Sequence, residues 1–158
     1  MFQEKNQGFS SRLGIKGLCH VRLFGPDGKI KEERIIHNTV TELGDAHVAD
    51  AMSDQGEGAL GYIAVGTGSG QGAADTGLDT VLDRNALTST NQGIGANDND
   101  VIFVGNWAAG DGTGAITEAG IFLGDNNTSM NYYADFAAVN KAAADTLEID
   151  WTVTYGAS

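Results

Sequence analysis

The sequence predicts a mainly β protein: an antiparallel β-sandwich, jelly-roll-like, with one short helix and an extended N-terminal arm. The first observation is a series of about seven or eight short strand-like runs, separated by Gly, Asn and Asp roughly every 8–12 residues. The second is that apolar residues recur clearly at helical spacing in only one stretch, 38–53. A barrel-like all-β domain is the other arrangement that this pattern allows.

The chain divides into an arm and one domain. Residues 1–13 are polar, have no periodicity and contain Gly8 and a pair of serines, which predicts an extended arm. Residues 14–158 are predicted to form a single β-sandwich domain, because 158 residues suit one domain and a hydrophobic content of 41% is typical of globular proteins.

A hairpin is predicted at the start of the domain. Leu18–Phe24 alternates in polarity, Gly25–Gly28 (GPDG) has the composition of a tight turn, and Lys29–His37 is the return strand. Cys19 falls on the face opposite His20, so we expect a small core residue rather than a nucleophile. A lone cysteine also excludes an internal disulfide framework, which fits an intracellular origin.

One helix is predicted to follow the hairpin. Thr39 and Glu42 have the spacing of a capping box, with Thr39 as the N-cap. His47 lies on or beside the apolar face, so we expect it to be packed rather than to bind a metal. The residues at helical spacing are Val40, Leu43, His47, Val48, Ala51 and Met52.

The remainder of the chain is predicted to supply the other strands. The segment Leu78–Arg84 is expected to be one helical turn or irregular, and Thr146–Tyr155 has the clearest alternation of all. A close approach or a bulge is expected at Gly120. The predicted strands are Tyr62–Val65, Asn85–Ser89, Val101–Ala109, Ala115–Leu123, Asn131–Val139 and Thr146–Tyr155.

Charge is distributed unevenly along the chain. The net charge is −12, yet residues 1–34 have a charge of +3 and the remainder −15. An acidic total argues against nucleic-acid binding, and we expect the basic front end to bind an acidic partner or a neighbouring copy. Neutralisation within the fold is the alternative. The predicted partner-binding residues are Phe2, Lys5, Phe9, Arg12, Lys16, Arg22, Lys29, Lys31 and Arg34.

The sequence contains only incomplete matches to motifs for ligand binding or catalysis. The loop Gly66–Gly70 follows a strand but is followed by Gln71–Gly72 rather than the Lys-Ser/Thr pair of a phosphate-binding loop. The segments Asn97–Asp100 and Asp125–Asn127 are rich in oxygen ligands for calcium, without the spacing of an EF-hand. Glu148 and Asp150 share one strand face, as a glycosidase pair would. No apolar run of membrane-spanning length or secretory signal is present in the sequence.

The order of motifs resembles small virion proteins of tailed bacteriophages. These motifs are HNTVTELG before the helix, YIAVGTG, Arg84, VIFVGNW, TEAGIF, Lys141 and DTLEIDWTVTY, and they extend over roughly residues 21–155. The resemblance implies a structural protein of the virion without enzymatic activity or a cofactor. It implies a capsid decoration (cement) protein that binds the major capsid protein, as a homotrimer on the capsid surface of a particle assembled in the host cytoplasm.

A second role stays open within the same family. Such proteins also appear as tail-tip, baseplate or fibre modules, where we expect contacts with host surface glycans. Trp107, Tyr132 and Tyr133 are the aromatic residues that would suit such contacts. A hydrolase is a third hypothesis, which needs a convergent acid–base or metal site.

Overall fold

A computed structural model describes residues 14–156 of the chain, and the predicted arm, residues 1–13, lies outside them. Strands make up 52% of the described residues and helix 10%, so the fold is mainly β. The elements of the described part are β1 (Ile15–Phe24), β2 (Ile30–His37), β3 (Thr39–Val40), α1 (Glu42–Met52), β4 (Tyr62–Gly66), β5 (Val81–Ala86), β6 (Ser89–Gln92), the 3₁₀ helix η1 (Gly95–Asn97), β7 (Asp100–Trp107), β8 (Gly114–Phe122), β9 (Met130–Lys141) and β10 (Thr146–Tyr155).

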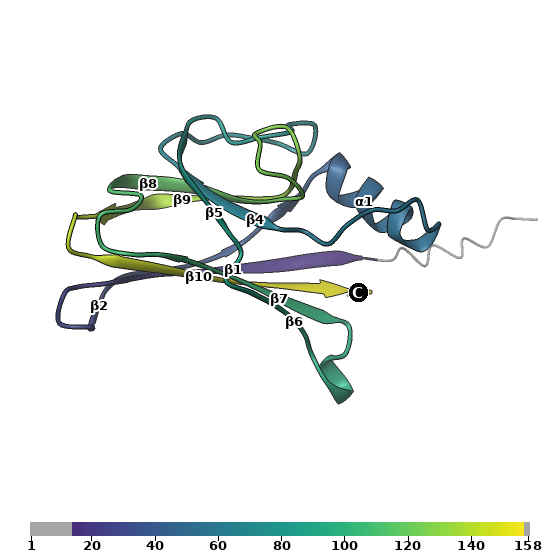
Figure 1. Cartoon of the computed structure of the whole chain (residues 1–158), viewed down its shortest axis with the longest axis horizontal. Helices are drawn as coiled ribbons and strands as arrows, with labels where there is room; N and C mark the ends of the chain where they lie inside the picture. Colours follow the sequence, from purple (N-terminus) through teal and green to yellow (C-terminus); the bar gives the residue numbers. More distant parts are fainter. Residues whose placement is uncertain (1–13, 157–158) are drawn as a thin grey trace, which may run out of the picture.

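The strands form two antiparallel five-stranded sheets that lie one above the other (Figure 1). Sheet A has the order β2-β1-β10-β7-β6, and sheet B has the order β3-β9-β8-β4-β5. The first and last strands of the described part therefore lie side by side in sheet A, where β1 pairs with β10 along its whole length. The predicted sandwich of antiparallel sheets with one helix is confirmed.

The core lies between the two sheets. Alternation in β10 places Leu147, Ile149, Trp151 and Val153 inward, each at most 1% exposed, as the sequence pattern predicted. Burying each of these side chains contributes about 1.5–3 kcal/mol before conformational entropy is counted. Cys19 is fully buried in the same core, and its burial raises the pKa of the thiol, which fits a packing role.

The helix α1 begins two residues later than the capping-box pattern predicted. Thr39 and Val40 pair with Tyr133 and Tyr132 of β9 as strand β3, so Thr39 is not the N-cap. Thr41 takes that position, and its hydroxyl oxygen accepts a hydrogen bond from the amide of Gly44 at 3.1 Å. The backbone pairing of Thr39 and Val40 with β9 is a tertiary contact, and it places the cap at Thr41 although both threonines suit an N-cap.

The apolar face of α1 is only partly buried. Leu43, His47 and Val48 are half-buried, whereas Met52 at the C-terminal end is 84% exposed. The helix packs on β9 at one end of the sandwich, on the side of sheet B (Figure 1). It closes one end of the core instead of lying across a sheet.

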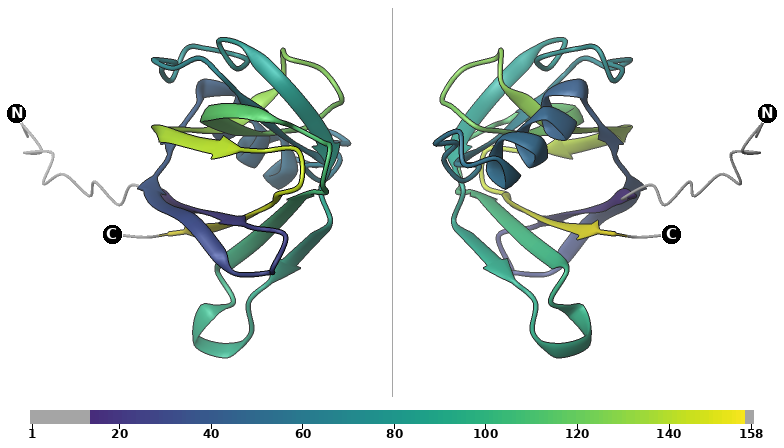
Figure 2. Two further views of the ribbon diagram at one scale, coloured as in Figure 1. Left: turned by 90° about the vertical axis from the view of Figure 1, so that its left-hand side faces the viewer. Right: turned by 90° about the vertical axis from the view of Figure 1, so that its right-hand side faces the viewer.

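Two sequence expectations between residues 78 and 89 were wrong in part. The segment Leu78–Arg84, expected to be a helical turn or irregular, is irregular only over residues 78–80 and then enters β5, and the strand expected over 85–89 is divided between β5 and β6. Asp83, Arg84 and Asn85 pair with Val65, Ala64 and Ile63 of β4, so backbone pairing at a sheet edge decides their structure despite their polarity. The β6–β7 hairpin projects from the body (Figure 2).

Candidate functional site

The outward surface of sheet A is a regular surface that the described part of the fold leaves uncovered. No described element lies on it in the view of Figure 1, because α1 packs on sheet B. Alternate residues of four adjacent strands point outward there. We define the outer face as Lys16, Leu18, His20, Arg22 and Phe24 of β1, Glu33, Ile35 and His37 of β2, Glu148, Asp150, Thr152 and Thr154 of β10, and Ile102, Val104 and Asn106 of β7.

Aliphatic residues recur across the outer face. Leu18 is 40% exposed, Ile35 61% and Ile102 36%. The register places Leu18 opposite Thr152, which in turn lies opposite Ile102. Ile35 was not singled out from the sequence, although the adjacent pair Ile35-Ile36 in a strand contained the signal, because one of two neighbours must face solvent. The outer face therefore offers apolar area for a partner.

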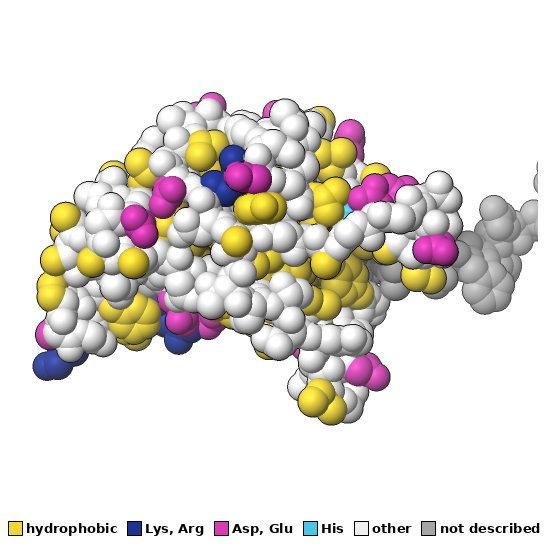
Figure 3. Space-filling model, in the orientation of Figure 1, with side chains coloured by type: hydrophobic (Ala, Val, Ile, Leu, Met, Phe, Trp, Pro, Cys, Tyr) yellow, Lys and Arg dark blue, Asp and Glu magenta, His cyan; other side chains and the backbone are white. Residues whose placement is uncertain are grey.

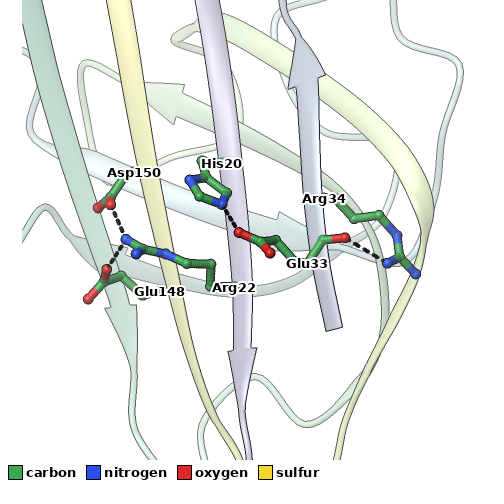
Figure 4. Close-up of polar contacts among 6 residues, drawn as sticks. All are labelled: His20, Arg22, Glu33, Arg34, Glu148 and Asp150. Atoms are coloured by element: carbon green, nitrogen blue, oxygen red, sulfur yellow. Dashed lines mark hydrogen bonds and ion pairs between the residues drawn. The ribbon is translucent and has the colours of Figure 1, made fainter. Parts of the chain in front are cut away.

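A ladder of charged side chains crosses the same face. The guanidinium of Arg22 donates hydrogen bonds to the carboxylates of both Glu148 and Asp150 on β10 (Figure 4). On the other side of β1, the ring of His20 meets the carboxylate of Glu33 on β2. The two carboxylates that share a face of β10 are thus held by one arginine, and its charge is balanced within the sheet.

Two further predicted partner-binding residues also make contacts within the fold. Lys31 Nζ lies 2.9 Å from a carboxylate oxygen of the buried Asp145, and this hydrogen bond holds the pKa of Asp145 below its usual range. Arg34 Nη2 donates to the carbonyl of Ala138 in β9 at 2.9 Å, which ties the edge of sheet A to sheet B. Neutralisation within the fold therefore accounts for much of the charge in the hairpin.

The other predicted basic residues differ in position. Lys16 is exposed on the outer face, and Lys29 is exposed in the turn before β2. Four of the nine predicted partner-binding residues, Phe2, Lys5, Phe9 and Arg12, lie outside the described residues. Acidic side chains appear at several places on the side shown in Figure 3, whereas lysine and arginine appear at few, in keeping with the net charge.

A groove of about 250 Å³ opens at the hairpin end of the outer face. Phe24 of β1, Trp107 of β7 and Glu148 of β10 line it. The indole Nε1 of Trp107 is buried and has no hydrogen-bond partner within the described residues. The groove therefore combines the ring of Phe24 and the carboxylate of Glu148 beside the aliphatic residues of the outer face.

The glycine-rich loop after β4 is organised by one buried carboxylate. Glu118 of β8 is fully buried and accepts hydrogen bonds from the amides of Gly68, Asp79 and Thr80 and from the hydroxyl of Tyr133, at 2.9–3.2 Å. The amide of Gly70 donates to another carboxylate, that of Asp135. These loop amides already bind carboxylates, so they do not form an anion cradle. Burial and the bond to Glu118 raise the pKa of Tyr133.

The motifs of the sequence resemblance meet one another inside the fold. Asn38 of HNTVTELG accepts a hydrogen bond from the indole of Trp151 in DTLEIDWTVTY at 2.9 Å. The guanidinium of Arg84 lies 4.5 Å from the ring centre of Phe122 in TEAGIF. Lys141, only 2% exposed, donates to the carbonyl of Ala108 just after VIFVGNW, and burial lowers the pKa of its ammonium group. These motif residues specify the fold instead of lining a site.

The aromatic residues that suggested glycan contacts are buried. Trp107, Tyr132 and Tyr133 are each only 1% exposed, because they pack in the two hydrophobic clusters of the sandwich. The expectation that they lie on the surface was therefore wrong. Phe24, half-buried at the groove, is the aromatic residue of the outer face.

The oxygen-rich loops use their side chains in local structure. Asn127 exchanges hydrogen bonds with the backbone of Leu78, and Asn126 accepts one from the amide of Thr128. Within residues 14–156, no three His, Cys, Asp or Glu side chains are grouped as metal ligands. In the same part of the chain, no helix combines the length and apolar character needed to cross a membrane.

Comparisons of the chain with protein-family models, with curated proteins and with solved structures found no match.

Proposed function

We propose that the chain is a non-enzymatic structural protein of a tailed-phage virion, a capsid decoration protein that binds and stabilises the head shell. Its partner is the major capsid protein, and it acts as a homotrimer on the capsid surface. The outer face of sheet A is the docking surface. The observation that carries the proposal is the position of Leu18, Ile35 and Ile102 on one uncovered sheet face.

The sequence resemblance supports the virion role. Its motif residues lie inside the fold, so other residues, on the surface, must bind the partner. The motif residues Asn38, Trp151, Glu118 and Lys141 make contacts within the sandwich. Since these contacts stabilise the fold, we assign recognition of the capsid protein to residues on the surface. The hairpin β1–β2, which we expected to bind the capsid, supplies two of the four strands of the outer face.

Apolar burial rather than basic charge provides the affinity in this proposal. Arg22 is balanced by Glu148 and Asp150, so net positive charge is not what the outer face offers. A stable contact buries about 1,200–2,000 Å² in total, and its strength comes from a few well-packed side chains near its centre. The groove beside Phe24 and Trp107 provides a socket for a side chain of the capsid protein.

Reconstitution with undecorated heads tests the proposal. Purified protein is added to undecorated heads of the phage that encodes it, bound protein is measured by sedimentation, and the resistance of the heads to heat is recorded. We expect saturable binding and a higher disruption temperature, because a ligand that binds only the assembled shell stabilises that shell by mass action. No binding, or binding without a gain in heat resistance, would contradict the decoration role.

Exposed aliphatic residues elsewhere provide matched controls for the docking surface. We expect Ile35→Asp and Ile102→Asp to weaken binding about tenfold or more, because each puts a charge into a buried interface. Ile94 is 91% exposed at the β6–β7 tip and Met52 is 84% exposed on α1, both off the outer face. Equal losses for Ile94→Asp or Met52→Asp would place the docking surface elsewhere.

The location of the protein in the virion separates the two structural roles. Density on the head supports decoration, and density on the tail supports a tail-tip, baseplate or fibre module instead. The three aromatic residues expected to contact glycans in the tail role, Trp107, Tyr132 and Tyr133, are buried in the core.

A further inference from the structure

A small pocket lies between α1, the loop after it and the loop before β9, at the end of the sandwich where α1 packs. Its volume is about 120 Å³. Leu43, Ala46, His47 and Asp50 form one wall, because positions i, i+3, i+4 and i+7 of a helix share a face. The walls thus come from three separate segments of the chain, each brought there by the fold.

One unmet donor, the side-chain amide of Asn131, points to a ligand in this pocket. Asn131, only 3% exposed, has a side-chain Nδ2 with no hydrogen-bond partner within the described residues. Nδ1 of His47 is also buried and lies 3.9 Å from Glu57 Oε2, beyond hydrogen-bond distance. A buried donor without an acceptor is costly, so the side-chain amide of Asn131 indicates a group that a bound molecule satisfies.

The position of Asn131 has a local cause. The β8–β9 pairing shifts register between Ile121 and Phe122, which lie opposite Tyr132 and Met130. Asn131 is therefore the extra residue of a bulge, and bulges redirect side chains toward functional sites. The hydroxyls of Thr128 and Ser129 at the same pocket are already used, by Asn126 and by the amide of Gly124. The side-chain amide of Asn131 thus differs from these two hydroxyls in having no hydrogen-bond partner.

The charge of the lining defines the ligand class. Asp50 and Glu57 are carboxylates, and no lysine or arginine lines the pocket. A metal ion is disfavoured because no three ligand side chains are grouped within residues 14–156. Leu43, Ala46 and Leu123 supply apolar wall between the carboxylates and Asn131. The pocket therefore suits an ammonium group at one end, a short aliphatic chain and a hydrogen-bond acceptor at the other.

We propose that this pocket binds a small amino alcohol, with its ammonium group at Glu57 and Asp50 and its hydroxyl oxygen accepting from Asn131 Nδ2. An apolar cavity of about 150 Å³ holds benzene in another protein, so about 120 Å³ admits roughly five heavy atoms. A neutral acceptor is preferred over a carboxylate, because two carboxylates already line the pocket. Binding of this ligand does not depend on docking through the outer face.

Titration of the full chain tests the proposal, with ¹H–¹⁵N NMR on the side-chain amide of Asn131. The probe is 3-amino-1-propanol, and the comparison probes are 1-butanol, which lacks the charge, n-butylamine, which lacks the acceptor, and β-alanine, which replaces the hydroxyl by a carboxylate. We expect saturable shifts with a dissociation constant on the order of millimolar for the amino alcohol. Binding by the three comparison probes should be several-fold weaker.

Charge variants distinguish the pocket from general attraction to an acidic protein. Glu57→Gln should weaken binding about tenfold, because it removes the charge-assisted contact. Glu42→Gln, on the exposed first turn of the same helix and outside the pocket lining, is the matched control and should leave the affinity unchanged. Equal effects of the two variants, equal binding of 1-butanol, or no shift of the Asn131 amide would each overturn the proposal. Binding of β-alanine at equal strength would also overturn it, by removing the preference for a neutral acceptor.

Discussion

A carboxylate oxygen of Glu118 lies 3.2 Å from the backbone nitrogen of Gly68, although the two residues are 50 positions apart. The same oxygen accepts from the amide of Thr80, so one side chain joins the loop after β4 to the segment before β5. In a buried site such bonds to an ionised acceptor are stronger than bonds between neutral groups. Glu118 thus acts as the anchor of the glycine-rich loop.

Replacing that anchor should destabilise the protein. In Glu118→Gln one oxygen becomes an NH₂ group that must face an amide or hydroxyl donor, because both oxygens accept from donors in the native protein. We expect a loss of about 2–4 kcal/mol in the free energy of unfolding. Urea titration followed by fluorescence of the buried Trp107 and Trp151 measures it. The exposed Glu33→Gln is the control, and a similar loss there would contradict the anchor role.

The close approach of Gly66 to Glu118 predicts a second effect. A Cβ at Gly66 would lie 2.4 Å from Glu118 Oε1 and 2.4 Å from the backbone oxygen of Thr80. We expect Gly66→Ala to cost about 1–3 kcal/mol of unfolding free energy, because one of the two contacts is with backbone. Gly61→Ala is the matched variant, since its Cβ would meet nothing nearer than 3.6 Å. Unfolding midpoints in urea that are equal for both variants would refute this account.

The start of α1 gives a prediction that distinguishes Thr41, the N-cap in the structure, from Thr39, the N-cap that the sequence pattern predicted. The hydroxyl of Thr41 donates to the carbonyl of Met130 at 2.6 Å while accepting from the amide of Gly44. Thr41→Val keeps the shape and should cost about 1–2 kcal/mol. Thr39→Val should change stability by less than about 0.5 kcal/mol, because Thr39 is in a strand and valine suits strands. Thermal unfolding measures both losses. A larger loss of stability for Thr39→Val than for Thr41→Val would indicate that Thr39 is the cap.

Local sequence patterns correctly predicted those elements whose own residue preferences agree with their packing in the fold. The strand Thr146–Tyr155 alternates cleanly and matches β10 in both bounds. β5 was missed because Asp83, Arg84 and Asn85 lack an apolar alternation, and only their pairing with β4 makes them a strand. The cap was misplaced because Thr39 and Thr41 are equivalent in sequence, and contact with β9 distinguishes them.

The candidate sites depend still more on contacts between distant residues. Arg22 was predicted to bind a partner from its charge, yet its carboxylate partners, Glu148 and Asp150, lie more than 100 positions away. A lone acid in the apolar run TEAGIF was a signal for a buried carboxylate at Glu118, although its donors could not be named from sequence. The pocket at Asn131 requires a bulge and two loops, for which no local pattern exists.

The contact between Lys31 and Asp145 predicts a dependence of stability on acid. The pKa of Asp145 is lowered in the folded protein, mainly by its hydrogen bonds to Lys31 and to the amide of Ala142. A lowered folded pKa means that this stabilisation is present above the unfolded pKa, near 4, and is lost as the pH falls through the folded pKa. Lys31→Met should therefore reduce the free energy of unfolding at pH 7, and its difference from the wild type should shrink as the pH falls below 4.

Urea titrations at pH 7, 4 and 2.5 measure this difference, with Lys29→Met as the matched control. Lys29 is exposed in the neighbouring turn, and within residues 14–156 no ion pair involves it, so its replacement should have the same small effect at each pH. The stem of Lys31 also lies beside Gly25, and loss of that packing would not depend on pH. A Lys31→Met difference that stays constant from pH 7 to 2.5 would therefore assign the role of Lys31 to its stem instead of its charge.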